Sequence, residues 1–286
     1  HTHYEALGRL VMPTRIYMAI DEMGFELKHL KGSWWEHLLS HKTIFQDVSV
    51  LIMGGMDCKG KLSSEEIKNV TQFVEQGGGL FLVAPLPYGN MTDLNHLSEN
   101  FGLQFMKWKA IDKEHHEGKH GDHVLFSNFV IHPVTTDIQT VSFGKSGGVT
   151  LKVSGNKARI LLTTDDDAIP PNSPTLAVVP YGNGIVAAFT CCTTFADEYI
   201  EKYDNLKLFT NILRYLAKAD LKKVELPKPK PLSKQPLGER RSLEVVSLDD
   251  MDGFEFQRFV AYLFARLGFG RIEEIRQVRD AGKDVI

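Results

Sequence analysis

The chain has 286 residues, of which 43% are hydrophobic and 24% are charged, an ordinary composition for a globular protein. Its formal net charge is -3, so the overall charge gives no sign of nucleic-acid binding, and any such sign must be local. Its three cysteines are too few for a disulfide framework and favour a reducing cytoplasm. No apolar run reaches the roughly 18 residues of a membrane-spanning helix, so we expect no membrane contact.

The first predicted elements are a helix and two strands. Residues 13–23 carry apolar side chains at helical spacing, and Gly24 ends this helix before a short strand that begins at Phe25. Residues 48–53 form a continuous apolar run that ends at Gly54. Such a run is typical of a strand buried on both faces of a parallel sheet.

The clearest local signal follows at residues 63–84. Ser63 and Glu66 have the spacing of a capping box, and residues 67–74 place apolar side chains on one helical face. Three glycines at 77–79 end the helix, and the apolar run 80–84 predicts another buried strand. Strand, helix and strand in this order predict a βαβ unit with parallel strands.

The rest of the first domain combines a helix with short apolar runs that are separated by polar stretches and turns. A helix is expected at residues 94–100, followed by a polar stretch rich in histidine. Short apolar runs at 149–153, 158–162, 175–180 and 185–190 alternate with turns at 154–156 and 181–184, which predicts hairpins at the edge of the sheet. A final helix is expected over 197–217. Prolines then alternate with lysines, so we predict a semi-rigid linker over 219–246 between a first domain, 1–218, and a second, 247–286.

The carboxy-terminal residues predict a helix, a strand and a tight turn. Apolar side chains from Phe254 to Leu267 share one helical face, Gly268 ends the helix, and residues 272–278 are strand-like. The pattern Asp-Gly-x-Glu-Phe-x-x-Phe-Val-Ala-x-Leu-Phe-x-x-Leu-Gly-Phe, followed by a strand and Gly-x-Asp-Val-Ile, resembles the start of the Mrr-type restriction endonuclease domain. That family belongs to the PD-(D/E)xK nucleases, and the resemblance covers about residues 249–286.

The resemblance implies a nuclease site that uses magnesium. Asp284 matches the first metal-ligating carboxylate and Glu255 matches a supporting acid on the first helix. A bound Mg²⁺ would polarise the scissile phosphate and supply hydroxide near neutral pH. The family's second acid and its lysine would follow Ile286, so we expect the intact protein to continue and this chain alone not to cut DNA. Two structural alternatives stay open: Asp252 and Glu255 form a helix N-cap, and Asp284 belongs to an ordinary turn.

Further motifs lie at residues 62–67, 73–80, 132–135, 182–186, 204–205 and 211–216. With these motifs the first domain resembles the non-catalytic, flavodoxin-like branch of the glutamine-amidotransferase-like superfamily. This resemblance implies an α/β fold with a mostly parallel sheet, helices on both faces and a β-rich edge section. Active amidotransferases carry a cysteine at a sharp turn after a strand, whereas residues 85–89 offer neither Cys nor Ser. We therefore interpret Cys58, Cys191 and Cys192 as structural and expect this domain to be non-catalytic.

Three further groups of residues are candidate ligand sites. A small-molecule or protein ligand would bind at the carboxyl ends of strands 48–53 and 80–84, near Asp57, Pro85 and Tyr88. The histidines at 115, 116, 120 and 123 suggest zinc, although a solvated loop is the simpler interpretation because they have no regular spacing on one face. The acidic run 165–167 suggests a cation, although a charged surface turn is the simpler interpretation.

These observations lead to one main hypothesis and one alternative. The main hypothesis is a cytoplasmic restriction or antiphage-defence endonuclease that cuts DNA with Mg²⁺ and forms a homo-oligomer. Its first domain would regulate the nuclease or bind a ligand. The alternative is a binding or oligomerisation module that carries a degenerate nuclease-like segment and catalyses nothing. A third hypothesis, an amidase in the first domain, lacks a nucleophile.

Overall fold

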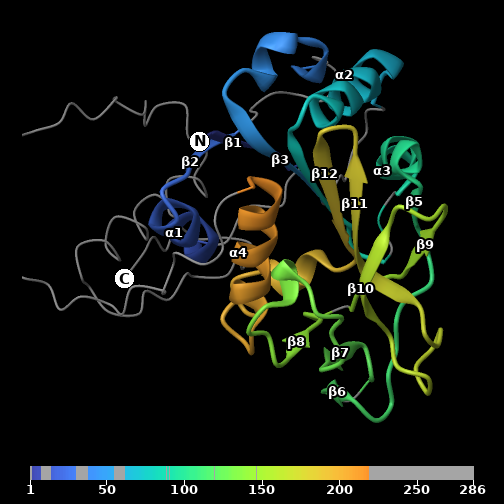
Figure 1. The fold of residues 1–286 in the computed structure, drawn as a ribbon. Helices are drawn as coiled ribbons and strands as arrows, with labels where there is room; N and C mark the ends of the chain where they lie inside the picture. Colours follow the sequence, from blue (N-terminus) through green and yellow to red (C-terminus); the bar gives the residue numbers. More distant parts are fainter. Residues whose placement is uncertain are drawn as a thin grey trace, which may run out of the picture. The chain divides into compact units, whose positions relative to one another are not determined.

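The structure is a computed structural model that describes residues 2–7, 14–29, 38–54, 62–87, 89, 91–118, 120–145 and 147–218. The chain divides into two units, residues 1–223 and 224–286, and all the described residues belong to the first. This unit has a mixed α/β fold (Figure 1). The predicted linker and nuclease-like segment lie outside the described residues.

The unit is built around a seven-stranded sheet with the order β10-β11-β12-β4-β3-β1-β2. The five strands from β12 to β2 run parallel to one another, whereas β11 and β10 are antiparallel to their neighbours. The strands are β1 (Thr2–Leu7), β2 (Glu26–His29), β3 (Val48–Gly54), β4 (Gly79–Val83), β10 (Arg159–Thr163), β11 (Pro174–Tyr181) and β12 (Gly184–Phe189). The predicted parallel pairing of the strands at 48–53 and 80–84 is confirmed.

Helices cover both faces of this sheet. Helices α1 (Thr14–Glu22) and α4 (Asn205–Leu216) share one buried cluster with alternate residues of β3, such as Val50. Helices α2 (Ser64–Glu75) and α3 (Thr92–Ser98) share a second cluster with the other residues of β3, such as Leu51. Successive side chains of a strand point to opposite faces, which is why a continuous apolar run serves a strand with a core on each side.

Helix α2 begins and ends as its sequence predicts. The Ser63 hydroxyl accepts the Glu66 amide at 3.2 Å, and the Glu66 carboxylate accepts the Ser63 amide at 2.9 Å, which completes the capping box. After the helix, Gly77 has a φ of 119°, which favours glycine. At Gly79 a Cβ atom would lie 2.7 Å from the Cβ of Leu216, so glycine lets α4 pack closely on the start of β4.

Two small sheets extend the unit beyond the main sheet. One pairs β5 (Leu103–Phe105) with β9 (Leu151–Val153), and the other contains β6 (His116–Glu117), β7 (His123–Phe126) and β8 (Val141–Ser142). Short 3₁₀ helices complete the connections: η2 (Leu38–Ser40), η3 (Lys42–Phe45), η4 (Glu99–Phe101), η5 (Pro133–Thr135) and η6 (Cys192–Phe195). Figure 1 shows the three-stranded sheet near the ends of α4 and β10.

The hairpin predicted around 181–184 forms between β11 and β12, and β10, β11 and β12 make up one side of the main sheet. Two other expectations from the sequence need correction. The turn at 154–156 does not close a hairpin, because β9 pairs with β5 while β10 pairs with β11. The last helix begins at Asn205 and not at residue 197, because Tyr203 has a left-handed φ of 50° that interrupts a helix. Strand β1 was not predicted, since its sequence is short and polar.

Polar side chains fix the start of α4 to the three-stranded sheet. The Asp204 carboxylate accepts the backbone amides of Gln139 and Thr140, at 2.7 and 3.2 Å. The buried Asn205 side chain accepts the Ser142 amide at 2.9 Å and donates to the Tyr199 carbonyl at 2.8 Å. Burial alone would raise the pKa of Asp204, but these amides and the Lys207 ammonium outweigh burial and lower it. The Asp-Asn pair therefore has a structural role.

The histidine of the sequence His-Pro-Val-Thr has a structural role too. His132 is buried, its ring Nδ1 accepts the Val134 amide at 3.2 Å, and its ring packs edge-on against Tyr215 of α4 at 4.6 Å. Burial, together with the positive charge of Arg159, lowers the pKa of His132 below its usual value of 6.5. The accepting Nδ1 requires the neutral ring, so protonation would break this cap.

We expect acid to destabilise the domain through His132. A folded-state pKa below the unfolded value means that the unfolded chain binds the proton more readily. The contribution of His132 is therefore fully present above about pH 6.5 and is lost as the pH falls below it. Thermal unfolding of the wild type should show a lower melting temperature at about pH 5.5 than at about pH 7.5. The His132→Asn variant, which keeps an acceptor at the cap, should lose part of this pH dependence. An unchanged pH dependence would contradict the assignment.

Candidate functional site

Most of the predicted site residues lie outside the described residues. This applies to Asp284 and Glu255 of the nuclease-like segment and to Asp57 and Tyr88 of the predicted ligand crevice. Pro85 is described: it is buried and directly follows Ala84, whose amide donates to the Phe189 carbonyl at 2.9 Å. The roles predicted for all five residues stay predictions.

The described part of the turn after β4 holds no nucleophile. Residues 84–87 and 89 are Ala, Pro, Leu, Pro and Gly, none of which carries a nucleophilic side chain. Cys191 and Cys192 follow β12, and both are free and buried. Burial raises the pKa of the Cys192 thiol to about 12, so the thiolate needed for catalysis does not form near neutral pH. The interpretation of these two cysteines as structural stays a prediction with which their burial agrees, and Cys58 lies outside the described residues.

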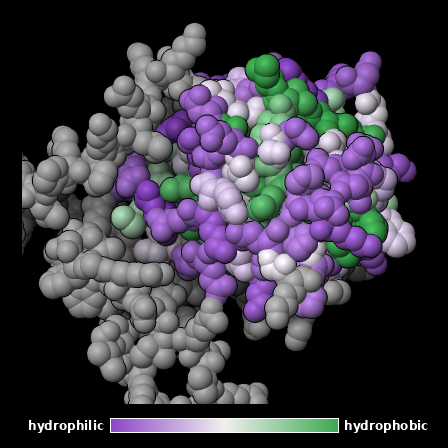
Figure 2. Space-filling view, turned by 90° about the horizontal axis from the view of Figure 1, so that it is seen from below, coloured by the Kyte–Doolittle hydropathy of each residue, from purple (hydrophilic) through white to green (hydrophobic). Residues whose placement is uncertain are grey.

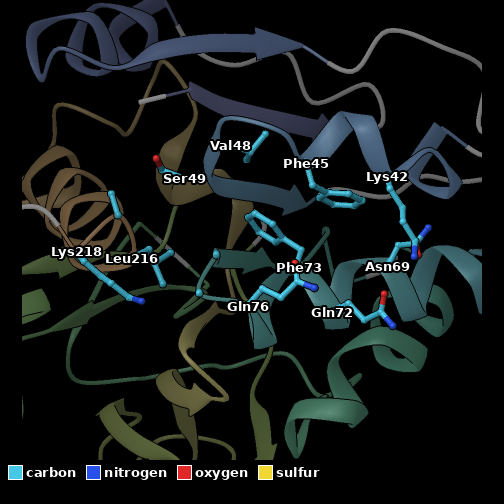
Figure 3. Close-up of a pocket in the computed structure, with 13 residues that line it drawn as sticks. Lys42, Phe45, Val48, Ser49, Asn69, Gln72, Phe73, Gln76, Leu216 and Lys218 are labelled. Carbon is cyan, nitrogen blue, oxygen red and sulfur yellow. The ribbon is translucent and has the colours of Figure 1, made fainter.

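A hollow of about 510 Å³ opens at the amino ends of β3 and β4 (Figure 3). The predicted crevice, in contrast, would lie at the carboxyl ends of the same two strands. The walls of the hollow come from η3, α2 and the end of α4. The lining residues are Lys42, Phe45, Val48, Ser49, Asn69, Gln72, Phe73, Gln76, Gly77, Gly78, Leu216, Ala217 and Lys218.

The chemistry of this hollow suits a polar or acidic partner. The described residues that line it include two lysines and no carboxylate, with Lys42 at one end and Lys218 at the other (Figure 3). The Lys218 ammonium donates to the Asn183 carbonyl at 2.5 Å, and the rings of Phe45 and Phe73 lie 5.3 Å apart. The Asn69 amide is already bound to the carbonyl oxygens of Leu39 and Ser40. The lining residues that the structure describes offer positive charge and an aromatic wall, and none of them form an acid–base pair.

The described surface outside this hollow is mainly hydrophilic, with scattered hydrophobic residues. Figure 2 shows a mainly hydrophilic face on which hydrophobic residues form local patches. Among the large hydrophobic side chains that the structure describes, Ile131 and Trp108 are the most exposed, at 93% and 67%, and single exposures of this kind are ordinary. Among the described helices, none has both the length and the apolar character needed to cross a bilayer.

The structure forms one cluster of polar side chains that the sequence does not predict. The structure brings His115, Asp165 and Asp167 together with the buried Asp112. The sequence had suggested a histidine group and a separate acidic run, which are about 50 residues apart along the chain. Neither pattern pointed to Asp112, because a single aspartate in a loop carries no local signal.

Comparisons with known proteins assign two different kinds of similarity to the two ends of the chain. Residues 248–286 match the model of a restriction endonuclease family, which agrees with the resemblance seen in the sequence. The human protein named "Intraflagellar transport protein 52 homolog" is 24% identical over an alignment of 185 residues, and the match covers 56% of this chain and 42% of that protein. The chain thus spans less than half the length of this relative.

Solved structures with the same fold confirm the architecture of the described domain. The structure named "mmIFT52 N-terminal domain" has a TM-score of 0.63 at 21% identity and covers 77% of this chain and 99% of its own. A cytoplasmic protein from Salmonella typhimurium LT2 has a TM-score of 0.52 at 10% identity and covers 76% of this chain and 99% of its own. At these identities the similarity shows the fold alone. The chain thus joins a mixed α/β domain of this fold to a carboxy-terminal segment similar to restriction endonucleases.

Proposed function

We propose that this protein is a DNA endonuclease whose first domain binds or assembles and whose second domain cuts. The observation that carries the proposal is the match of residues 248–286 to a restriction endonuclease family. The sequence predicts a helix, a strand and a Gly-x-Asp turn, one after the other, in the same residues. The domain limits in this proposal are 1–218 for the first domain, 219–246 for the linker and 247–286 for the start of the nuclease domain.

The proposed chemistry is phosphodiester hydrolysis with Mg²⁺. Asp284 would hold the ion beside the scissile phosphate and Glu255 would support that site. Mg²⁺ prefers oxygen ligands, and one or two carboxylates plus substrate phosphates are its usual partners in enzymes. The ion would neutralise the developing negative charge and lower the pKa of the attacking water.

For the first domain we propose a non-catalytic binding and oligomerisation role. The similarity to an intraflagellar transport protein supports this role, as does the lack of a nucleophile in the described part of the turn after β4. We propose a flavodoxin-like fold of the amidotransferase-like kind for this domain, and the strand order β2-β1-β3-β4-β12 supports this proposal. A small-molecule or protein ligand would bind near Asp57, Pro85 and Tyr88. A cytoplasmic location and a role in antiphage defence complete the proposal.

We expect cleavage to depend on Mg²⁺. The full-length protein should convert supercoiled plasmid DNA to nicked or linear forms in the presence of MgCl₂, because the ion activates both phosphate and water. Chelation by EDTA should abolish the reaction, and a return of MgCl₂ should restore it. Agarose-gel assays over time measure both effects. Cleavage that survives EDTA would argue for metal-free chemistry, and no cleavage in MgCl₂ would reject the nuclease proposal.

A second candidate function follows from the similarity to an intraflagellar transport protein. In this case the protein binds a partner or itself, and the nuclease-like segment catalyses nothing. Sedimentation of the full-length protein, together with the cleavage assay, separates the two candidates. A stable oligomer without cleavage favours the binding module, whereas metal-dependent cleavage favours the nuclease.

A further inference from the structure

Two loops of the first unit meet beside the edge strand β10. One loop, residues 106–115, leads from β5 to β6, and the other, residues 164–173, joins β10 to β11. Ile111 and Ile169 connect the loops through an antiparallel bridge, with backbone hydrogen bonds of 2.9 and 2.7 Å. Two reciprocal bonds of this kind hold the backbones in register, so side chains next to the bridge have fixed starting positions.

Four side chains that could ligate a metal converge at this junction. Asp112 and His115 come from the first loop, and Asp165 and Asp167 come from the second. One ligand atom from each lies within 4.8 Å of all the others. The Nδ1 atom of His115 is 3.2 Å from Oδ2 of Asp165 and 4.0 Å from Oδ2 of Asp112. Four ligands at about 2.0–2.2 Å around a tetrahedral Zn²⁺ ion lie about 3.4 Å from one another. The ligand atoms at the junction are therefore spaced nearly as they would be around a bound ion.

The decisive atom is Oδ2 of Asp112. Asp112 is fully buried, and its Oδ1 accepts the backbone amides of Glu114 and His115 at 2.9 and 2.7 Å. Its Oδ2 is also buried, has no hydrogen-bond partner within the described chain, and faces His115. A buried carboxylate oxygen without a partner is costly, so the fold requires something else to satisfy it.

The charges around the junction favour a cation over a water molecule. Three carboxylates gather there, and in the described part of the chain no lysine or arginine forms an ion pair with any of them. The nearby Lys109 ammonium is committed to Asp122, at 2.7 Å. A water could satisfy one oxygen, but it would leave the mutual repulsion of the carboxylates in place.

We propose that Asp112, His115, Asp165 and Asp167 form a site for a divalent transition-metal ion of the Zn²⁺ type. The imidazole decides the class, because Mg²⁺ and Ca²⁺ prefer oxygen ligands alone whereas zinc accepts nitrogen and carboxylate oxygen together. The ion would connect the two loops and stabilise the end of the β10–β11 hairpin. This site is separate from the Mg²⁺ site of the proposed nuclease.

Titration calorimetry with ZnCl₂ on the full 286-residue chain tests the site. We expect one saturable site per chain. Loss of an outer-shell partner costs about 10–100-fold in metal affinity, so removing a ligand in His115→Ala or Asp165→Asn should weaken binding at least about 100-fold. The matched controls are Asp166→Asn, from the same acidic run, and His120→Ala, from the same histidine-rich stretch. Both should bind like the wild type.

Thermal unfolding of Asp112→Asn gives a second readout that does not depend on calorimetry. The variant keeps the acceptor for the two amides but loses the buried charge, so it should fold without metal and lose the Zn²⁺-induced rise in melting temperature seen for the wild type. The proposal is overturned if the wild type shows no saturable Zn²⁺ binding. It is also overturned if His115→Ala and Asp165→Asn bind as tightly as the wild type, or if Mg²⁺ or Ca²⁺ binds and Zn²⁺ does not.

Discussion

Replacing Asp284 with alanine in the full-length protein is expected to reduce DNA cleavage by about 100-fold or more. The proposed role of this carboxylate is to hold the Mg²⁺ ion on which the charge of the transition state depends. Groups aimed at developing charge are worth about 10²–10³ in rate, and loss of the metal removes several such effects together. Single-turnover cleavage of a labelled duplex at saturating MgCl₂ measures the change.

The control for Asp284 is Asp280→Ala in the same predicted turn. Both variants lose one negative charge, but the resemblance gives Asp280 no part in the metal site, so its cleavage rate should stay close to that of the wild type. Equal activity of Asp284→Ala and the wild type would remove the proposed role of Asp284. Equal loss in both variants would point to the turn itself and not to a metal ligand.

Replacing Phe81 with alanine is expected to destabilise the first domain by about 3–5 kcal/mol, the usual cost of removing a buried phenylalanine. Phe81 lies on β4 between β3 and β12 and is 0% exposed. Its ring centroid is 6.0 Å from that of Phe195 and 6.2 Å from that of Phe209. The substitution would leave a cavity between the sheet and α4 that the surrounding strands cannot close. Urea unfolding followed by circular dichroism measures the loss.

Ile131→Ala is the matched surface control for Phe81. The Ile131 side chain is 93% exposed, so its removal should change the free energy of unfolding by about 0.5 kcal/mol or less. If Phe81→Ala lowers the free energy of unfolding by less than about 1 kcal/mol, the result would contradict the packing described for this face of the sheet. Removal of a buried aromatic side chain normally destabilises a protein by more than that.

The sequence predicts those parts of the fold that depend on neighbours along the chain. The capping box of Ser63 and Glu66, the glycines after α2 and the continuous apolar runs of β3 and β4 each depend on a few consecutive residues. The βαβ unit follows from their order, because a helix that connects two neighbouring strands of one sheet makes those strands parallel. These elements were predicted to within a few residues.

Other parts depend on contacts between distant residues and could not be predicted from local patterns. Strand β9 pairs with β5 about 50 residues before it, although the turn after β9 suggested a hairpin. The junction of Asp112 and His115 with Asp165 depends on the bridge between two loops, which no spacing rule encodes. A buried carboxylate with a free oxygen becomes visible only when both loops are in place.

The position of β12 determines how the sheet must be completed during synthesis. β4 is made early, but its partner on one side is β12, whose residues 184–189 are made about 100 residues later. Until β12 is made, the backbone amides and carbonyls on that side of β4 have no strand partner. Because the side chains of β4 are also apolar, this open edge can pair with a strand of another chain. A nascent or truncated polypeptide that ends before residue 184 is therefore exposed to self-association, and the hairpin of β11 and β12 acts as the late closure of the sheet.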